Sequence, residues 1–250
     1  MTFLNHEKPL KTVIIENNDL NFIYKLIAEA NMNGADAFGL QVEKMLPEDR
    51  NKETYQKLFA AMGKPVYVTN YAHTTNEGKT YDELAEHLLL LAESGATLID
   101  VMGDYFDKHP IEFTEDPIAV EKQKKLIEEL HAKGAEVIMS SHVKKFIPAE
   151  QVLEIARGHQ ERGADICKIV TWSSSPEEEA ENLRIIGLLK KELKIPFLYL
   201  AGGSHQKILR RIGPMMGCCM WLCVQQHTNF STKAQPLLSA INAVCASFNG

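Results

Sequence analysis

The sequence has no apolar run approaching the roughly 20 residues that a membrane-spanning helix needs. It also lacks a surplus of basic residues. Its 27 Lys and Arg are outnumbered by 33 Asp and Glu, which gives a formal net charge of −6, whereas a nucleic-acid-binding protein usually presents a basic face. The N-terminus lacks the basic-then-apolar order of a secretory signal peptide. These absences argue against a transmembrane protein and against a nucleic-acid partner.

Motifs for metals and disulfides are missing as well. The sequence contains no HExxH motif, no CxxC pair and no Walker loop. Its five cysteines are odd in number, and four of them lie in apolar stretches that suit buried free thiols. We therefore expect reduced cysteines, no metal site and a cytoplasmic protein.

What the chain does contain is a regular alternation of short apolar runs with longer amphipathic ones. The apolar runs are almost continuously hydrophobic, as expected of strands that are buried on both faces of a parallel sheet. Eight strands are predicted in this way, at residues 12–16, 37–42, 65–70, 98–102, 136–142, 166–172, 196–201 and 215–224.

Between these runs, apolar residues recur with the 3.6-residue period of amphipathic helices. Helices are predicted at residues 19–32, 81–93, 117–132, 148–162, 176–193 and 235–248. A Gly-Ala pair separates a helix from the next strand at Gly34, Gly95, Gly134 and Gly163. Glycine just past a helix can adopt the left-handed conformation that ends it, so the same unit recurs along the chain.

Repeated strand–helix units in 250 residues predict an α/β protein with one (β/α)8 TIM barrel domain spanning residues 1–250. The alternative is an open, doubly wound sheet, which usually carries a glycine-rich nucleotide loop after its first strand. The sequence at that place is Glu16-Asn-Asn-Asp, without glycine. The barrel is therefore favoured, and its active site is expected at the carboxyl ends of the strands.

Lys168 is the most informative residue in those strands. It stands in the apolar run Ile-Cys-Lys-Ile-Val-Thr-Trp, and lysine is rarely buried without a partner. Burial favours the neutral amine, which can attack a ketone or aldehyde to form a Schiff base. The structural alternatives are a lysine whose amine reaches solvent at the strand end and a buried ion pair with a carboxylate.

His142 ends the neighbouring strand, directly after Ser140 and Ser141. Neighbouring strands lie about 5 Å apart, so its imidazole could reach a substrate carbon that is held on Lys168. Histidine is the usual general base near neutral pH, and we predict that role for it. The alternative is a histidine at the rim of the barrel that only stabilises a loop.

An anion site is predicted after the seventh and eighth strands. A short helix opened by the Gly202-Gly pair would lie at the corner where many barrels bind anions, and Arg211 on that helix suits a carboxylate. Ser231 and Gln235, in the last loop, could donate hydrogen bonds to the same anion. Of the adjacent Arg210 and Arg211, one is expected to lie on a solvated helix face.

The predicted barrel resembles the type I 3-dehydroquinate dehydratases. That family has a strand ending in Ser-x-His and then a strand beginning Gly-Ala-Asp-x-x-Lys; this chain has Ser140-Ser-His142 and Gly163-Ala-Asp-Ile-Cys-Lys168. The resemblance runs through nearly the whole chain. It implies a lyase without a cofactor that dehydrates 3-dehydroquinate to 3-dehydroshikimate in the shikimate or quinate pathway. Because related barrels are often dimers, it also implies a homodimer.

The resemblance also implies a role for each candidate residue. Lys168 would form an imine with the ring ketone of the substrate, and His142 would remove the adjacent C2 proton and then protonate the departing hydroxyl. Arg211-Ile-Gly is similar to the family's Arg-Ile-x-Gly, and Ser231-Thr-Lys-Ala-Gln235 has the family's Ser-x-x-x-Gln spacing. Arg211, Ser231 and Gln235 would therefore hold the ring carboxylate.

The side of the family's site that recognises the substrate hydroxyls differs here. The family's Glu-x-Arg in the second strand is Gly39-Leu-Gln41, and its arginine after the third strand is Tyr71. The acidic residue of the fourth strand is Met102, although Asp100 remains. Gln41 and Tyr71 are therefore predicted to contact the substrate without the charges that the family uses.

The family's glutamate that positions the catalytic histidine corresponds to Thr75, or to Glu77 after a small insertion. Four functions stay open: dehydration of 3-dehydroquinate with altered contacts, the same imine chemistry on a less hydroxylated keto-carboxylate, a class I aldolase that uses the Gly202-Gly pair to bind phosphate, and a barrel that binds a carboxylate without turnover. The last is the least favoured, because Lys168 and His142 are both retained.

Overall fold

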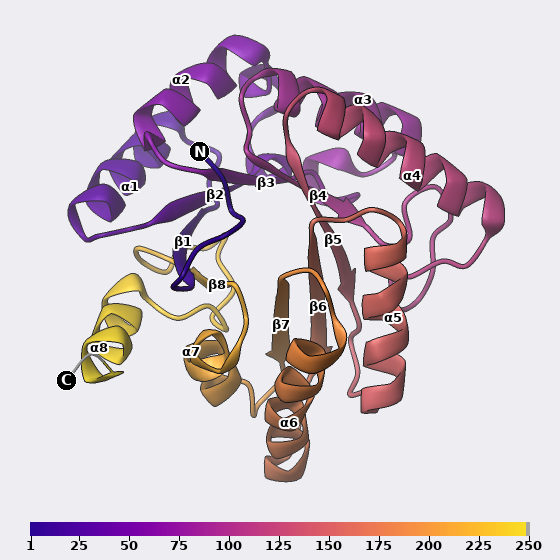
Figure 1. The fold of residues 1–250 in the computed structure, drawn as a ribbon. Helices are drawn as coiled ribbons and strands as arrows, with labels where there is room; N and C mark the ends of the chain where they lie inside the picture. Colours follow the sequence, from indigo (N-terminus) through magenta and orange to yellow (C-terminus); the bar gives the residue numbers. More distant parts are fainter. Residues whose placement is uncertain (249–250) are drawn as a thin grey trace.

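In the computed structural model, which describes residues 1–248, the strands form the inside of a barrel and the helices form its outer layer (Figure 1). Eight parallel strands are hydrogen-bonded in the order β7-β6-β5-β4-β3-β2-β1-β8. Their bounds are β1 Leu10–Ile15, β2 Ala37–Gln41, β3 Val66–Thr69, β4 Leu98–Met102, β5 Glu136–His142, β6 Ile166–Trp172, β7 Phe197–Gly202 and β8 Met220–Cys223. The single-domain (β/α)8 prediction is confirmed.

The helices follow the strands in strict alternation. The described residues form α1 Leu20–Met32, α2 Lys52–Met62, α3 Tyr81–Glu93, α4 Pro117–Ala132, α5 Ala149–Glu161, α6 Pro176–Glu192, α7 Lys207–Met216 and α8 Leu238–Phe248, with short 3-10 turns η1 Val42–Lys44, η2 Pro47–Asp49 and η3 Thr74–Asn76. The four glycines of the Gly-Ala pairs have φ between +81° and +101°. They adopt the left-handed conformation predicted for them, which lets each helix turn directly into the next strand.

Alternate residues of each strand face two different environments, because successive side chains of a strand point to opposite faces. Phe38 and Val66 belong to the set that packs against the surrounding helices. Ile14, Tyr67 and Leu98 belong to the opposite set, which meets inside the barrel. Both sets are buried. A polar side chain on the inner set is therefore enclosed unless it lies near the carboxyl end of its strand.

The barrel has a seam between β7 and β8, because no hydrogen-bonded ladder joins these two strands within the described residues. One backbone hydrogen bond crosses the seam, from the N–H of Cys219 to the C=O of Phe197 at 2.8 Å. Phe197 begins β7, so this bond lies at the amino end of the strand. Toward the carboxyl ends, beside the segment that follows β8, no ladder within the described residues joins the two strands.

Two elements differ from the sequence prediction. Residues 52–62 were not predicted to be helical, yet they form α2, whose first turn is capped by the Asn51 side chain accepting from the N–H of Thr54. The strand predicted at 215–224 is wrong over its first half, which belongs to α7 as far as Met216. This apolar run contains the last residues of a helix and a four-residue strand, and residues 217–219 separate the two. Residues 249–250 of the predicted domain lie outside the described residues.

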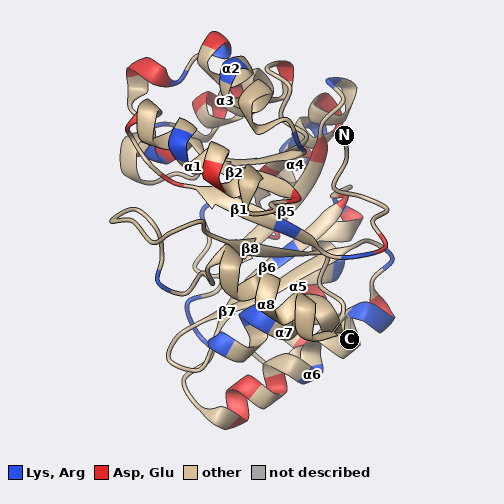
Figure 2. Cartoon of the chain, turned by 90° about the vertical axis from the view of Figure 1, so that its left-hand side faces the viewer, with Lys and Arg blue, Asp and Glu red and all other residues tan. Residues whose placement is uncertain are grey.

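The surface carries both signs of charge. In the view of Figure 2, Lys and Arg lie interspersed with Asp and Glu over the outer helices rather than gathered on one of them. No helix within residues 1–248 is long and apolar enough to cross a membrane. The five cysteines are all free, as the sequence predicts, and Cys167, Cys218 and Cys223 are buried.

Candidate active site

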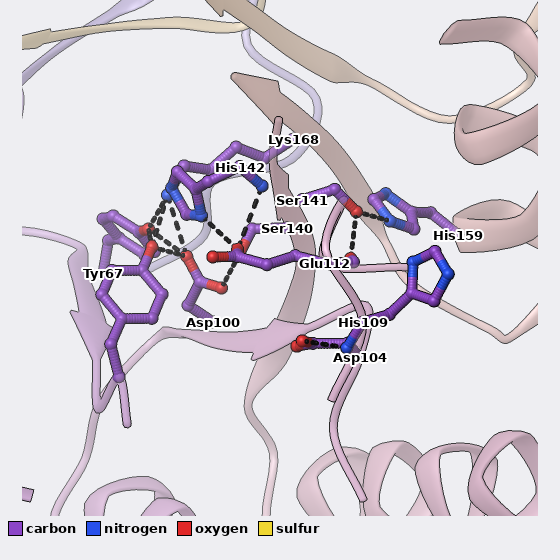
Figure 3. A network of polar contacts seen from close by, with 11 residues as sticks. Tyr67, Asp100, Asp104, His109, Glu112, Ser140, Ser141, His142, His159 and Lys168 are labelled. Carbon is purple, nitrogen blue, oxygen red and sulfur yellow. Dashed lines mark hydrogen bonds and ion pairs between the residues drawn. The ribbon is translucent and has the colours of Figure 1, made fainter. Parts of the chain in front are cut away.

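Lys168 lies near the middle of β6 with its side chain inside the barrel. It is only 4% exposed, and its Nζ lies 3.1 Å from Oδ2 of Asp100, which stands on β4 two strands away (Figure 3). Ser140 of the intervening β5 lies in register with Lys168 and donates to the other carboxylate oxygen of Asp100 at 2.5 Å. The buried ion pair considered from the sequence is therefore present, and it fixes the amine at a defined point inside the barrel.

Two tyrosines complete the surroundings of the amine. Nζ of Lys168 donates to the hydroxyl of Tyr67 at 3.0 Å and to the hydroxyl of Tyr71 at 2.6 Å. Both phenols in turn donate to Oδ2 of Asp100, Tyr71 at 2.7 Å. Tyr67 belongs to β3, whereas Tyr71 follows two residues after the strand ends. The amine therefore contacts three oxygens, one charged and two phenolic.

The charges of this cluster follow from its burial. Burial alone would raise the pKa of Asp100, but the Lys168 ammonium and the hydrogen bonds that the carboxylate accepts hold it below its ordinary value. Burial, and then the Asp100 carboxylate, raise the pKa of Tyr67 and of Tyr71 well above the ordinary value for tyrosine. Asp100 is therefore ionised at neutral pH, and both tyrosines are neutral phenols that can donate a proton.

His142, at the end of β5, is held by a carboxylate. Its Nδ1 lies 2.6 Å from Oε2 of Glu112, and its backbone N–H donates to the same oxygen at 3.0 Å. Burial would raise the pKa of Glu112, but these hydrogen bonds from His142 hold it below its ordinary value. A carboxylate on Nδ1 favours the imidazole tautomer with its hydrogen there. Nε2 is then the nitrogen left to accept a proton.

Tyr71 also contacts the histidine. The edge of its ring meets the ring of His142, with centroids 5.3 Å apart and an interplanar angle of 84°. Its hydroxyl, as described, bonds to Lys168. The structure therefore brings together the two residues that the sequence singled out, Lys168 and His142, through one side chain that the resemblance had placed among the substrate contacts.

The loop between β4 and α4, which carries Glu112, is fixed from the barrel and from α5. Ser141 donates to the C=O of Glu112 at 2.6 Å, and the buried Arg162 donates to the C=O of Thr114 and stacks 4.2 Å from the ring centroid of Phe113. Glu112 itself has φ of +48°, a left-handed conformation that is uncommon for a residue with a side chain. Such a backbone persists only where its surroundings hold it, and it is frequent at functional sites.

Comparison with known proteins identifies the family. The sequence model of the family described as type I 3-dehydroquinase matches residues 12–247, which is nearly the whole chain. The chain belongs to the type I 3-dehydroquinase family. None of the curated proteins compared with the sequence matches it.

Solved structures of this family share the fold. The 3-dehydroquinate dehydratase of Geobacillus kaustophilus has a TM-score of 0.81 and 18% identity, over 97% of this chain and 92% of that one. A type I enzyme of Clostridium difficile, solved with covalently modified comenic acid, has a TM-score of 0.80 and 18% identity, over 97% and 93% of the two chains. The enzyme of Enterococcus faecalis has a TM-score of 0.76 and 18% identity, over 97% and 95%. At these identities, the similarity establishes the barrel and its topology.

The structure places the adjacent Arg210 and Arg211 in different surroundings. The structure places Arg211 on the outer side of α7, half-buried, where it donates to the C=O of Lys207 at 3.1 Å. Arg210 is buried, and its Nε donates to the C=O of Ala201 in β7 at 2.7 Å. Arg210 is thus the arginine that faces the barrel.

The other two predicted carboxylate ligands lie in the segment after β8 and differ from each other. Ser231 accepts from the N–H of Thr228 at 2.8 Å and donates to the C=O of the same residue, so its hydroxyl closes a turn within its own loop. Gln235 is buried next to Glu16 at the end of β1. One side-chain oxygen of Gln235 and one of Glu16 find no hydrogen-bond partner in the described part of the chain.

Side chains of β1 and β3 fill the space beside Gly39. A Cβ atom at Gly39 would lie 2.3 Å from Cδ1 of Ile14 and 3.1 Å from Cδ1 of Tyr67, so these two side chains leave no room for a larger residue at this position. Gln41 is half-buried at the end of β2, and Met102 belongs to the apolar core. The space beside Gly39 is thus occupied by Ile14 and the Tyr67 ring, while the two phenols lie against the carboxylate of Asp100.

Sequence reasoning missed the residue that supports His142. Thr75 is engaged elsewhere, accepting from Arg50 at 2.9 Å and donating to the C=O of Glu43 at 2.8 Å, and Glu77 is exposed. Glu112 takes the position beside the histidine from the loop after β4. The position of Glu112 in the sequence does not predict this contact, because only the conformation of that loop brings its side chain to the end of β5.

Proposed function

We propose that this chain is a Schiff-base-forming lyase that removes water from 3-dehydroquinate to give 3-dehydroshikimate. One observation carries the proposal: a buried lysine amine inside the barrel shares a tyrosine with a histidine–carboxylate pair. Membership of the 3-dehydroquinase family supports the dehydration as the reaction. Lys168, His142 and Glu112 supply between them the nucleophile, the base and the group that orients the base.

The chemistry follows from these groups. Lys168 attacks the ring ketone and forms an imine, which draws electrons away from the neighbouring carbon. Nε2 of His142 then removes the C2 proton, with Glu112 stabilising the imidazolium that results. The carbanion is delocalised into the imine, and His142 returns the proton to the hydroxyl as it departs. Hydrolysis of the product imine releases the lysine.

The ring carboxylate is assigned to Arg210 in place of Arg211, together with Gln235. Arg210 is buried, which lowers its pKa to about 10, and its remaining guanidinium N–H groups are free for a planar anion. Ser231 joins them only when the loop after β8 turns its hydroxyl from Thr228 toward the barrel.

A second candidate keeps the same imine chemistry but takes a less hydroxylated keto-carboxylate. The observation that favours it is the packing of Tyr67 against Gly39, which places apolar ring surface where the family binds hydroxyls. A hydroxyl buried there without a partner would lose about 1–3 kcal/mol. The two candidates share Lys168 and differ only in the substrate.

The aldolase alternative lacks support at its phosphate-binding element. A Cβ at Gly202 would meet the ring of Trp172 at 2.7 Å, and one at Gly203 would meet the C=O of Ser173 at 2.3 Å. The two glycines therefore allow β7 to pack closely against the end of β6. This close packing alone accounts for glycine at both positions, so neither glycine indicates a phosphate-binding site.

Borohydride trapping tests the proposal. Wild-type protein is incubated with 3-dehydroquinate and sodium borohydride, and the modified peptide is located by mass spectrometry. We expect one reduced adduct on Lys168, absent from Lys168→Ala and retained in the control Lys125→Ala, which removes an exposed lysine of α4. An adduct only with other keto-acids supports the second candidate. A barrel that binds a carboxylate without turnover gives no adduct with any carbonyl compound, and that result contradicts both imine proposals.

A further inference from the structure

Formation of the imine requires protons to move between nitrogen and oxygen. An ammonium and a ketone contain the same atoms and charge as a protonated imine and one water. Two protons must therefore pass from Nζ of Lys168 to the carbonyl oxygen, one as the carbinolamine forms and one as it loses water. No net proton enters or leaves, so the single positive charge beside Asp100 is conserved from start to finish.

Asp100 is suited to hold that charge rather than to carry the protons. Its carboxylate accepts from Ser140, from both tyrosines and from Lys168, so all of its binding capacity is used. An acceptor stabilised in this way takes up a proton poorly. The relay must then be a group that contacts Nζ and can both give and take a proton.

His142 is engaged at the other end of the reaction. Its Nδ1 is bound to Glu112, and Nε2 is the single nitrogen left, which the proposed C2 step already uses. The two phenols are the remaining groups on Nζ. Of these, Tyr67 lies within β3 and deeper in the barrel, whereas Tyr71 lies past the strand end, makes the shorter contact with Nζ and touches the ring of His142.

We infer that Tyr71 is the acid–base residue for forming and hydrolysing the imine, an inference that rests on the proposed function. The Tyr71 oxygen takes one proton from the Nζ ammonium, and the freed lone pair of Nζ attacks the ketone carbon. The Tyr71 hydroxyl gives its own proton to the ketone oxygen, which yields the carbinolamine protonated on nitrogen. In the next step Tyr71 takes the second proton from Nζ and gives its own to the departing hydroxyl. The C–O bond breaks, water leaves, and the freed nitrogen lone pair forms the C=N bond of the protonated imine. His142 is left to act on carbon alone.

The test compares the rate of imine formation in four proteins by rapid mixing with 3-dehydroquinate and timed borohydride quenching. For Tyr71→Phe, which keeps the ring and removes the hydroxyl, we expect trapping about 10²-fold slower than in wild type, within the range for general acid–base catalysis. For Tyr67→Phe we expect less than about a 10-fold decrease. Tyr24→Phe, at a half-buried position of α1, is the control for loss of a tyrosine hydroxyl outside the site.

Two readouts separate proton relay from a structural role. Small general acids in the buffer, such as imidazolium, should partly restore trapping in Tyr71→Phe and should leave Tyr67→Phe unchanged. His142→Ala should still give the adduct of the substrate imine, without loss of the C1 hydroxyl. Thermal unfolding of each variant confirms that it is folded.

Three outcomes overturn the inference: equal trapping rates in wild type and Tyr71→Phe, equal slowing in both tyrosine variants with no rescue by buffer acids, or loss of the adduct in folded His142→Ala. Absence of an adduct in wild type is a different result, because it contradicts the proposed function itself and is read before any variant is compared.

Discussion

The two sides of the barrel mouth are built differently. On the side formed by β3 to β6, Lys168, Asp100 and Ser140 stand on neighbouring strands whose register is fixed by continuous hydrogen-bonded ladders. On the side formed by β7, β8 and the segment after them, Arg210 is on a helix and Gln235 is in a loop, next to a seam that one backbone hydrogen bond crosses. The first side, which we call the rigid side, holds its groups in contact. The second, which we call the loop side, does not.

This difference separates the chemistry from the recognition of the substrate. Bond formation at Nζ requires distances correct to a fraction of an ångström, which strands in register supply. A carboxylate can be gripped by residues that close on it, and these can be carried by a loop. The predictions below test each side in turn.

The largest effect is expected from breaking the ion pair of the rigid side. Asp100→Asn removes the charge that Lys168 faces at 3.1 Å and leaves a buried ammonium without a counter-charge. Removing one partner of a buried pair usually costs about 3–5 kcal/mol, and we expect a decrease of that size in the free energy of unfolding. Urea denaturation measures it. The control is Asp165→Asn, which is half-buried outside the barrel; an equal loss in both would contradict a special role for the pair.

Two buried carboxyls, one on each side, should make stability depend on pH. Burial raises the pKa of Glu43, next to β3, and of Glu16, at the end of β1, to about 7 each. A raised pKa means that the folded state binds the extra proton between about pH 4.5 and 7, so stability is lost as pH rises through that window.

Replacing either residue by glutamine should remove its part of this dependence. Relative to wild type, Glu43→Gln should gain at most about 3 kcal/mol of stability between pH 5 and pH 8. Glu16→Gln should gain less, because Glu16 is less completely enclosed. Parallel stability curves for wild type and Glu43→Gln, measured by urea denaturation across this range, would show that the carboxyl is ionised at low cost.

Glu112→Gln should affect the rate more than binding. The amide keeps a hydrogen-bond acceptor at Nδ1 but removes the negative charge that stabilises the imidazolium of His142. We expect kcat to fall by about 10- to 100-fold with KM within about 3-fold, in steady-state assays with 3-dehydroquinate. Glu115→Gln, exposed in the same loop, is the matched control. A rise in KM at constant kcat would instead assign Glu112 to substrate binding.

The loop side should respond in the opposite way. Arg210→Met removes the guanidinium that faces the barrel, and we expect KM to rise about 10-fold, as for loss of one charged hydrogen bond. Arg211→Met should leave KM unchanged, because within residues 1–248 its side chain bonds only to its own helix. If the two variants exchange these results, Arg211 reaches the substrate and the outward position described above is wrong.

The sequence predicts the fold and the rigid side better than the rest. Continuous apolar strands and left-handed glycines determine the barrel, and the alternation of side chains along β6 places Lys168 inside. The exact position of the inward arginine could not be predicted, because Arg210 and Arg211 are adjacent and only the phase of α7 decides between them. Glu112 was missed because the conformation of its loop decides where the carboxylate lies. The hydrophobic periodicity of the sequence does not predict the conformation of a loop.

The seam between β7 and β8 has a mechanical consequence. A barrel closed by an unbroken ladder resists widening equally along every strand pair, whereas this one can widen along a single line at the expense of side-chain packing and of the one backbone hydrogen bond between Cys219 and Phe197. Breathing along that line would carry α7 and the segment after β8 outward together, while the run of strands from β3 to β6 keeps its dimensions. The molecule could thus admit a substrate and release a product by loosening its hold on the carboxylate, without disturbing the amine, the phenols or the imidazole.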